Sequence, residues 1–428
     1  MEGPRPIRSG GGSIWSSAAA RARPSPPSSR ATTGVAGLKT IVPVSAISSW
    51  YDYYRANGLV VAPHSNTNGA GDNFYLGEDT DVLGDYIGGP RMQVGGFCRF
   101  MHDFLVSEQN RVTGDYSPFW AERDYLGRVG DITASVFVVH GLNDWNVRTK
   151  AFAEWWYRLA AAGVERRIWL HNGGHGGPRD ARGAIDAEYL RAENRWFDHY
   201  LFGVANGVED EPRATIQRED NSYASEADWP APGTRDVTLQ LSARSPTEPG
   251  TLTVRRQGAT VQRFVDRGRE LDTDDVLIQA PDRADPNRLV YRTAPLAERV
   301  RLSGTPWVDL RMSIDNRKAA NLTAVLVDYG AAGSTVAPQM VTRGWLDPQN
   351  RLGAGVSTPI IERQRYRLRW DLQPDDYVFA AGHRIGLVVV STDHDYTLRP
   401  LPGTRLALEP GASAITLPLV GGAGALQG

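Results

Sequence analysis

Strand-like and helix-like patterns of apolar residues alternate over residues 132–203. The β-branched run from Ser135 to Val139 predicts a fully buried strand, and Arg166 to His171 predicts a second, shorter one. The helix expected between them has large apolar side chains at the spacing of one helical face: Phe152, Trp155, Trp156 and Leu159. Another helix is expected from about Ala184 to Phe202, with Gly203 at its end. These lengths predict a βαβ unit with parallel strands.

Upstream of this unit the alternation is interrupted. Thr40 to Ser48 has the pattern of a core strand, although Pro43 lacks the amide that a central strand would donate. Residues from about Trp50 to Arg128 are rich in aromatic side chains and glycine turns, and we interpret them as a helical cap inserted between two core strands. Such insertions commonly build substrate pockets.

From about Pro212 the pattern changes to short alternating runs separated by Gly, Pro, Asp and Asn. These runs predict an all-β sandwich. They are VTLQLSA, LVYRTA, WVDLRMSI, LTAVLVDY, YRLRWDL and RIGLVVVS. The segment DNSYASEADWPAPGTRD is expected to be the crossing loop into the sandwich. The expected fold class is α/β plus all-β: a disordered segment at 1–30, a partial α/β core at 31–204 with the insertion at about 50–128, and a β-sandwich at 205–428.

The residues that suggest chemistry follow the two predicted strands. Asp144 lies in the turn after Gly141, and His175 lies in a glycine-rich loop after the second strand. Because neighbouring parallel strands end at the same edge of a sheet, the carboxylate and the imidazole are expected to lie close together. A carboxylate there can fix the tautomer of the imidazole and stabilise the imidazolium. Either residue alone is more often structural, but the joint placement favours catalysis.

No metal ion or cofactor is expected. His171 and His175 have the spacing of zinc ligands on a helix, but the glycines around them favour a loop. The acidic segments DHDY and DTDD could bind calcium, although such turns are usually only solvated. Asn321 begins an N-x-T glycosylation sequon inside a predicted strand, which we interpret as fortuitous.

Composition limits the classes of function. A chain of 428 residues suggests two or three domains. The net charge of −2, without a basic stripe, gives no electrostatic reason to expect binding to nucleic acid. No apolar run approaches the about 18 residues of a membrane span. The single cysteine, Cys98, excludes a disulfide within the chain.

Several segments resemble the X-prolyl dipeptidyl aminopeptidases of the actinobacterial branch, which are serine peptidases of the α/β-hydrolase fold. They include GDYSPFWAERDYL, VVHGLNDWNV, GGHGGP and RWDLQPDDYVFAAGHRIGLVVVSTDHDYTLRP, and the resemblance runs from about Ala31 to the C-terminus. It implies that Asp144 and His175 are the acid and base of a Ser…Asp…His triad. It also implies that the sandwich is a jelly roll and that Xaa-Pro dipeptides are released from peptides with proline at the second position.

The sequence departs from this family at the nucleophile. The family's serine elbow should lie just upstream of ATTGVAGLKTIV, yet the sequence contains no G-x-S-x-G, and Ser13 has no strand before it. Residues 1–30 are almost entirely Arg, Pro, Ser, Gly and Ala, which predicts disorder, and they lack the apolar stretch of a signal peptide. Our hypothesis is that the reading frame is lost before about Ala31 and that this chain is inactive.

An Xaa-Pro exopeptidase must hold a free ammonium group and a proline ring. The ammonium group needs a carboxylate, and the ring needs an apolar or aromatic slot. By analogy with the family we favour Glu78 for the ammonium group and Phe119 with Trp120 for the ring, while Trp145 and Asn146 follow the predicted catalytic acid.

The alternative is that Glu122, the other candidate carboxylate, pairs with Arg123 or Arg128, and that the aromatic side chains are the core of the cap.

Two other functions remain as alternatives. The first is an acyl hydrolase of the cocaine-esterase or glutaryl-acylase type, which shares the core and the jelly roll. The second is a non-catalytic remnant whose β-sandwich binds a ligand or partner. Chain length and the motifs of the cap favour the peptidase. The sequence leaves open a homodimer, the cellular compartment and the preferred first residue of the substrate.

Overall fold

A computed structural model of the chain describes residues 37–61, 100, 103–105, 107–110, 112–394, 396–398 and 400–426. The chain divides into two compact units. The first contains the residues up to Ser48, Tyr125–Gln217 and Tyr223–Ser225, and the second contains Ser49–Asp124, Arg218–Ser222 and Glu226–Gly428.

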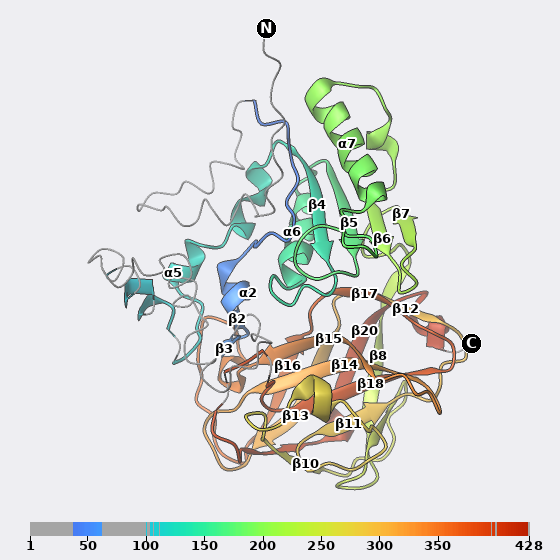
Figure 1. The fold of residues 1–428 in the computed structure, drawn as a ribbon. Helices are drawn as coiled ribbons and strands as arrows, with labels where there is room; N and C mark the ends of the chain where they lie inside the picture. The colour runs from blue at the N-terminus through green and yellow to red at the C-terminus, as the bar shows by residue number, and fades with distance from the viewer. Residues whose placement is uncertain are drawn as a thin grey trace. The chain divides into compact units, whose positions relative to one another are not determined.

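The first unit contains a five-stranded sheet in the order β1-β4-β5-β6-β7 (Figure 1). Its strands are β1 (Thr40–Ile41), β4 (Ser135–Gly141), β5 (Arg166–His171), β6 (Ala214–Gln217) and β7 (Tyr223–Glu226). β1, β4, β5 and β6 pair in parallel, which confirms the parallel strands predicted over 135–139 and 166–171. Through β6 and β7 the sheet continues past Gly203, where the sequence pattern placed the end of the α/β segment.

The first strand is much shorter than the pattern over 40–48 predicted. Beyond Ile41 the contact with β4 is reduced to single hydrogen bonds. The carbonyl of Pro43 accepts from the amide of Val139 at 2.9 Å, and the amide of Ser45 donates to the carbonyl of Val139 at 3.0 Å. Pro43 has no amide to donate, and Ser45 then turns the chain away with a left-handed φ of 48°.

Two helices pack on the strands of this sheet. They are α6 (Lys150–Ala161) and α7 (Ala187–Phe202), and the 3-10 turns η3 (Leu126–Asp131) and η4 (Val208–Asp210) complete the unit. Phe137 of β4 packs with Trp196 of α7, whereas the ring of His140 contacts Phe152 of α6, so alternate residues of β4 face the two helices. The predicted apolar face of α6 is buried as expected.

The ends of α7 follow from its capping residues. It begins three residues later than the pattern predicted, because the side chain of Asp186 accepts the amides of Glu188 and Tyr189 and caps the first turn. It ends at Gly203, which has a left-handed φ of 69°.

The second unit is built mainly from thirteen strands, β8 to β20. They are β8 (Thr234–Ser242), β9 (Gly250–Thr253), β10 (Gln262–Val265), β11 (Leu289–Arg292), β12 (Val300–Gly304), β13 (Trp307–Ile314), β14 (Leu322–Ala331), β15 (Gln339–Leu346), β16 (Arg365–Asp371), β17 (Asp375–Phe379), β18 (His383–Val390), β19 (Arg405–Leu408) and β20 (Ala414–Val420). Short helical turns are η5 (Thr273–Leu277), η6 (Pro348–Asn350), η7 (Pro410–Ala412) and η8 (Gly422–Leu426).

The strands of the second unit pair antiparallel, with one parallel pair between β9 and β11. Each of the six alternating runs coincides with a strand, and four of them extend one or two residues beyond it. β16 shows why: Tyr366, Leu368 and Trp370 are buried, whereas the arginines between them are exposed. The inward side chains form one large core cluster that spans β8 to β20. The predicted class, an α/β sheet followed by a large and mostly antiparallel β domain, is confirmed.

The described part of the insertion belongs to the second unit. It contains α2 (Trp50–Tyr54), β2 (Arg55–Ala56), β3 (Leu59–Val60) and α5 (Pro118–Ala121). The aromatic side chains of α2 and α5 pack together in a cluster that includes Tyr51, Tyr54, Phe119 and Trp120. The guanidinium of Arg55 is buried over the ring of Trp120, at 5.2 Å from its centroid.

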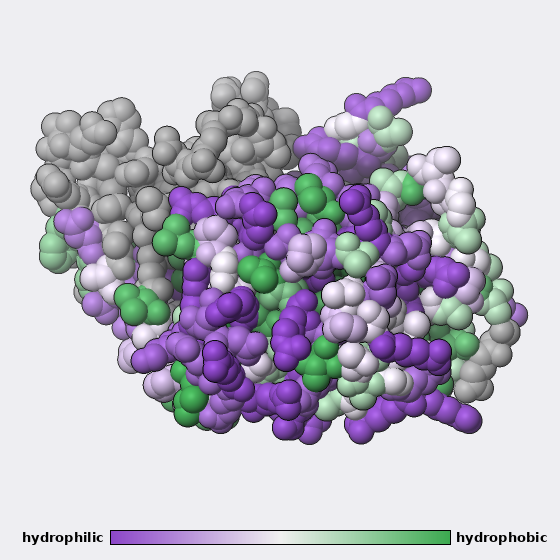
Figure 2. All heavy atoms as spheres, turned by 90° about the horizontal axis from the view of Figure 1, so that it is seen from below, coloured by the Kyte–Doolittle hydropathy of each residue, from purple (hydrophilic) through white to green (hydrophobic). Residues whose placement is uncertain are grey.

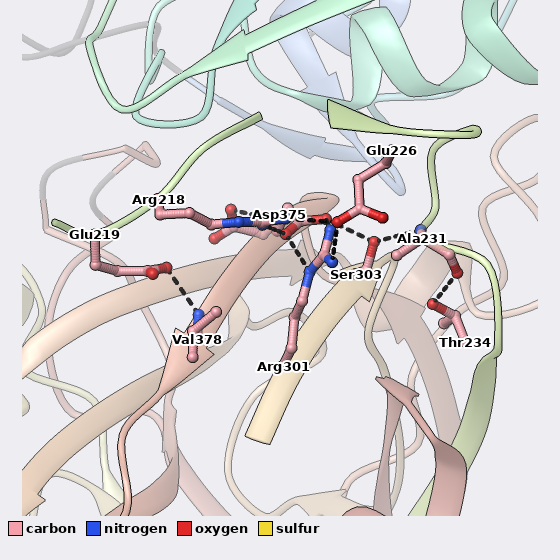
Figure 3. A network of polar contacts seen from close by, with 10 residues as sticks. Arg218, Glu219, Glu226, Ala231, Thr234, Arg301, Ser303, Asp375 and Val378 are labelled. Carbon is pink, nitrogen blue, oxygen red and sulfur yellow. Dashed lines mark hydrogen bonds and ion pairs between the residues drawn. The ribbon is translucent and has the colours of Figure 1, made fainter. Parts of the chain in front are cut away.

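The segment expected to be the crossing loop contains β7, and a buried ionic network holds it (Figure 3). The carboxylate of Asp376 on β17 accepts hydrogen bonds from Arg218 at 2.7 Å, Arg301 at 2.8 and 2.9 Å and Ser303 at 2.6 Å. Glu226, the last residue of β7, accepts from both arginines at 2.9 and 2.8 Å. The segment around β7 is therefore fastened to β12 and β17 by charge-assisted hydrogen bonds.

Hydrophilic residues cover most of the molecular face drawn in Figure 2, where apolar residues form small groups. This distribution agrees with the burial of the long apolar runs inside the sandwich. Among the helices that the structure describes, none is both long enough and apolar enough to cross a membrane.

Candidate active site

The turn after β4 fixes the carboxylate of Asp144. The side chain is fully buried, and its Oδ1 accepts the amides of Asn146 at 3.1 Å and Val147 at 2.9 Å. The amide of Asp144 itself donates to the carbonyl of Gly141 at 3.1 Å. These bonds leave Oδ2 as the oxygen that faces the neighbouring loop.

His175 occupies that loop, directly after β5. Its Nδ1 lies 3.0 Å from Oδ2 of Asp144, and its side chain is 48% exposed. Because a carboxylate only accepts, Nδ1 carries the proton, and the lone pair of the neutral ring is on Nε2. The hydrogen bond to Asp144 raises the pKa of His175 above its usual value, against the opposing effect of burial. This is the arrangement of an imidazole that can take up a proton at Nε2.

The charge of Asp144 is stabilised by its partners. Burial by itself would raise the pKa of this carboxyl, but the hydrogen bond from His175, the neighbouring imidazoles and the amide of Val147 together lower the pKa below its usual value. The carboxylate therefore stays ionised beside His175, as a group that stabilises an imidazolium must.

The loops of Asp144 and His175 are joined through their backbones. The amide of Leu142 donates to the carbonyl of His171 at 2.7 Å, and the amide of Asn143 donates to the carbonyl of Gly173 at 3.2 Å. A Cβ atom at Gly141 would lie only 2.3 Å from the carbonyl oxygen of Gly173 and 2.4 Å from that of Gly174. The close approach of the two loops therefore requires glycine at position 141.

His171 has a structural place in the same loop. Its Nδ1 accepts the amide of Gly173 at 3.2 Å, so its Nε2 carries the proton and donates to the carbonyl of Gly176 at 3.1 Å. Burial lowers the pKa of His171 to about 4, which keeps the ring neutral. Since both ring nitrogens are occupied by loop backbone, the geometry gives no support to a metal site shared by His171 and His175.

Two residues of this site were missed by the sequence reasoning. His140 on β4 is buried, with Nε2 2.8 Å from the carbonyl of Val147 and 3.9 Å from Oδ2 of Asp144. Its signal was a single polar residue inside an otherwise apolar buried strand. Ser45 accepts the amide of Gly176 at 3.0 Å. Periodicity gives no signal for Ser45, because its part of the chain has left the regular strand.

The other predicted site residues are divided between the units. Trp145 and Asn146 lie next to Asp144 in the first unit and are half-buried. Phe119 and Trp120 belong to the second unit and are 7% and 0% exposed, which is the packing expected of a cap core. Glu122 forms an ion pair with Arg123 at 3.4 Å, which agrees with the alternative that Glu122 pairs with a neighbouring arginine. Glu78 lies outside the described residues.

Comparison with protein families gives matches in both units. Residues 28–177 match the X-Pro dipeptidyl-peptidase (S15 family) model. Residues 206–424, half of the chain, match the X-Pro dipeptidyl-peptidase C-terminal non-catalytic domain. The chain belongs to the X-Pro dipeptidyl-peptidase family. Its matched S15 segment contains both Asp144 and His175.

Individual members of the family are similar over most of this chain. A putative Xaa-Pro dipeptidyl-peptidase of Bacillus anthracis is 43% identical over 92% of this chain and 62% of its own length. A putative Xaa-Pro dipeptidyl-peptidase of Streptomyces avermitilis is 36% identical over 92% of this chain and 60% of its own length. The chain thus spans about three fifths of the length of these two relatives.

Solved structures share the fold. An aminopeptidase from a marine sediment archaeon, Thaumarchaeota archaeon, superposes with a TM-score of 0.68 at 17% identity, covering 89% of this chain and 72% of that one. A CocE/NonD family hydrolase of Staphylococcus aureus gives a TM-score of 0.65 at 14% identity, covering 89% and 68%. At these identities the likeness concerns the fold alone.

Proposed function

We propose that this chain carries the acid and the base of a serine exopeptidase that releases Xaa-Pro dipeptides from the N-termini of peptides. The observation that carries the proposal is the 3.0 Å hydrogen bond between the buried carboxylate of Asp144 and the half-exposed imidazole of His175. Membership of the X-Pro dipeptidyl-peptidase family supports the choice of substrate. The actinobacterial assignment remains a prediction, since relatives from Bacillus and Streptomyces both match.

The proposed chemistry is acyl transfer. Nε2 of His175 takes the proton of a serine hydroxyl as the serine oxygen attacks the carbonyl carbon of the substrate's proline residue. Asp144 stabilises the imidazolium that forms. His175 then returns the proton to the leaving amine, and water repeats the cycle on the acyl-enzyme. The raised pKa of His175 suits a group that must both accept and donate a proton near neutral pH.

The proposal includes the absence of a serine nucleophile, which is inferred from the sequence. No G-x-S-x-G motif occurs in it. Ser45 engages the backbone of Gly176, and the hydroxyl of Ser48 donates to the carbonyl of Ala151 at 2.7 Å, so neither is placed as an activated serine. We propose that the chain in this form does not hydrolyse Xaa-Pro substrates.

Substrate recognition is proposed from the residues nearest the acid and from the cap. Trp145 and Asn146 follow Asp144 directly and are candidates to contact the substrate. Glu78 is proposed to bind the substrate ammonium group. Phe119 and Trp120 are proposed to supply the slot for the proline ring. Because Trp120 is completely buried, Phe119 is the side chain proposed to contact the ring. No cofactor is needed for this chemistry.

The test compares two proteins. The chain as printed, incubated with Ala-Pro-p-nitroanilide and with a fluorophosphonate probe, should give neither hydrolysis nor labelling. The same chain fused behind a segment that supplies a G-x-S-x-G elbow should give both, and His175→Ala should abolish both. Stoichiometric labelling of the chain as printed would show that it contains a nucleophile and would overturn the proposed inactivity.

The same assay separates the alternatives. An acyl hydrolase of the cocaine-esterase or glutaryl-acylase type would cleave a simple ester and leave the Ala-Pro anilide intact. A non-catalytic protein would cleave neither after the nucleophile is restored, and its β-sandwich would be tested for retention on glycan or protein surfaces. Either result would replace the exopeptidase proposal.

A further inference from the structure

A second imidazole lies on the other side of the Asp144 carboxylate. His140 is on β4 and is 1% exposed, and its ring packs on Phe152 with centroids 5.0 Å apart. Its Nε2 is 2.8 Å from the carbonyl of Val147 and 3.9 Å from Oδ2 of Asp144. Oδ2 is the same oxygen that accepts from His175. One carboxylate oxygen therefore faces two histidines.

The hydrogen bond to Val147 determines the tautomer of His140. A backbone carbonyl only accepts, so Nε2 must carry the proton. The N–H thus lies on the side of the ring that faces both the turn 144–147 and the carboxylate. The amide of Val147 donates to Oδ1 of Asp144 at 2.9 Å, and the carbonyl of Val147 accepts from His140. Both backbone groups of Val147 are therefore hydrogen-bonded, one to Asp144 and one to His140.

Burial decides which of the two histidines can become charged. The complete burial of His140 lowers its pKa. Asp144 and the carbonyl of Val147 oppose burial with smaller effects, and the nearby His175 adds the smallest effect, in the same direction as burial. His175, with half of its side chain exposed, has its pKa raised by Asp144. The third histidine nearby, His171, is also kept neutral by burial. Of these three histidines, His175 is therefore the one that becomes positively charged beside the carboxylate of Asp144.

We propose that His140 is a positioning residue for the acid–base pair: as a neutral imidazole it holds the turn of Val147 and presents an N–H dipole to Asp144. Without this contact the turn could move away from β4, and Asp144 would lose part of its alignment with Nδ1 of His175. This inference rests on the proposed roles of Asp144 and His175. It concerns the geometry of the pair and not the chemistry of turnover.

The experiment follows histidine resonances by NMR in the full chain, with ¹⁵N- and ¹³C-labelled histidine. The chain has eight histidines, so the spectra can be assigned by substitution. In the unmodified protein, His140 should be the Nε2–H tautomer and should remain neutral over the range in which His175 titrates. His175 should titrate above a free imidazole and should show a low-field Nδ1–H resonance that Asp144→Asn removes.

Three substitutions separate positioning from packing. His140→Leu removes the N–H and keeps most of the volume, and it should lower the proton affinity of His175 by about tenfold, one pKa unit. His140→Gln restores an N–H at the distance of Nε2 and should recover most of that loss. Phe152→Leu disturbs the packing of the same ring and keeps the N–H of His140, and it should leave the titration of His175 unchanged.

Two outcomes would overturn the positioning role of His140. If His140→Leu and Phe152→Leu have equal effects on His175, or if His140 is the Nδ1–H tautomer, the positioning role is wrong. Should His140→Leu not fold, the tautomer and the His140→Gln titration still test it. None of these readouts needs a nucleophile, so a missing peptidase activity would count against the proposed function and leave this inference standing.

Discussion

The hydroxyl of Ser45 accepts a hydrogen bond from the amide of Gly176 at 3.0 Å, one residue after the histidine of the proposed acid–base pair. Ser45 has a left-handed φ of 48°, a conformation that is unfavourable for residues with a side chain. The hydrogen bond from its own amide to the carbonyl of Val139 helps hold it there. The strain is thus located where the chain after β1 ends its hydrogen bonding to β4 and meets the loop of His175.

Substitution of Ser45 separates the hydroxyl from the backbone strain. Ser45→Ala keeps the strained φ and loses the hydrogen bond, so it should lower the free energy of unfolding by about 1 kcal/mol. Ser45→Gly also loses the hydrogen bond but relieves the strain, which should make it more stable than Ser45→Ala by about 1 kcal/mol. Urea denaturation measures both. Equal stabilities of the two variants would mean that the left-handed conformation of Ser45 stores no strain.

Gly141 is expected to be the least replaceable glycine of the site. A Cβ at this position would lie 2.3 Å from the carbonyl oxygen of Gly173, so Gly141→Ala must push the His175 loop away from β4. We expect a loss of about 1 to 3 kcal/mol in stability and a loss of the Nδ1–H resonance of His175. Gly177→Ala is the matched control, because a Cβ at Gly177 meets no atom within 4 Å. If both variants behave alike, the close approach of the two loops does not depend on Gly141.

The sequence predicted the sheet and its acid–base pair because both follow from local patterns. The runs at 135–139 and 166–171 carry their own strand signal, and Asp144 and His175 come directly after them, so parallel pairing alone brings them together. The six alternating runs of the sandwich were predictable for the same reason, since each alternates between core and solvent within a few residues.

The remaining features depend on contacts between distant residues, which leave no periodic signal. Ser45 and Gly176 are 131 positions apart, and their contact exists only because the chain turns out of β1 at that point. The network of Arg218, Arg301 and Asp376 joins a loop to two strands, with 158 positions between its first and last members. Single charged residues of that kind look like ordinary surface residues in a sequence. The extension of the sheet through β6 was missed because Ala214–Gln217 lies beyond the change of pattern at about Pro212 and was assigned to the sandwich.

A buried acid beside this network should make stability depend on pH. Burial, with Asp376 and Glu219 nearby, raises the pKa of Asp375 well above its usual value of 3.8. The folded chain therefore keeps a proton that the unfolded chain releases, so the stabilising contribution is complete below the usual pKa and declines as pH rises above it. Asp375→Asn, which mimics the neutral acid, should raise the melting temperature at pH 7 to 8 and change it little at pH 4.

One control variant accompanies the Asp375 experiment. Asp376→Asn should lower stability at neutral pH by several kcal/mol, because it removes one of the two carboxylates that Arg218 and Arg301 share and leaves Glu226 alone to pair with both. Melting curves of the three proteins across this pH range are sufficient. An Asp375→Asn variant that is less stable than the unmodified chain at pH 8 would show that Asp375 is ionised in the folded state.

The last prediction concerns the acid limb of the pH–rate profile once the nucleophile is restored. His175 acts as a base only when its Nε2 is free, and the hydrogen bond to Asp144 raises its pKa above 6.5. The value of kcat/KM for Ala-Pro-p-nitroanilide should therefore fall as pH drops through that raised pKa. Asp144→Asn removes the negative charge and should move this limb to lower pH, since the imidazole is then easier to deprotonate. The same substitution should lower the plateau rate on the order of 10⁴-fold, because an amide neither selects the correct tautomer nor stabilises an imidazolium. A variant that loses rate without any shift of the limb would place Asp144 outside the electrostatic environment of the base, and the pairing seen at 3.0 Å would then have no part in the reaction.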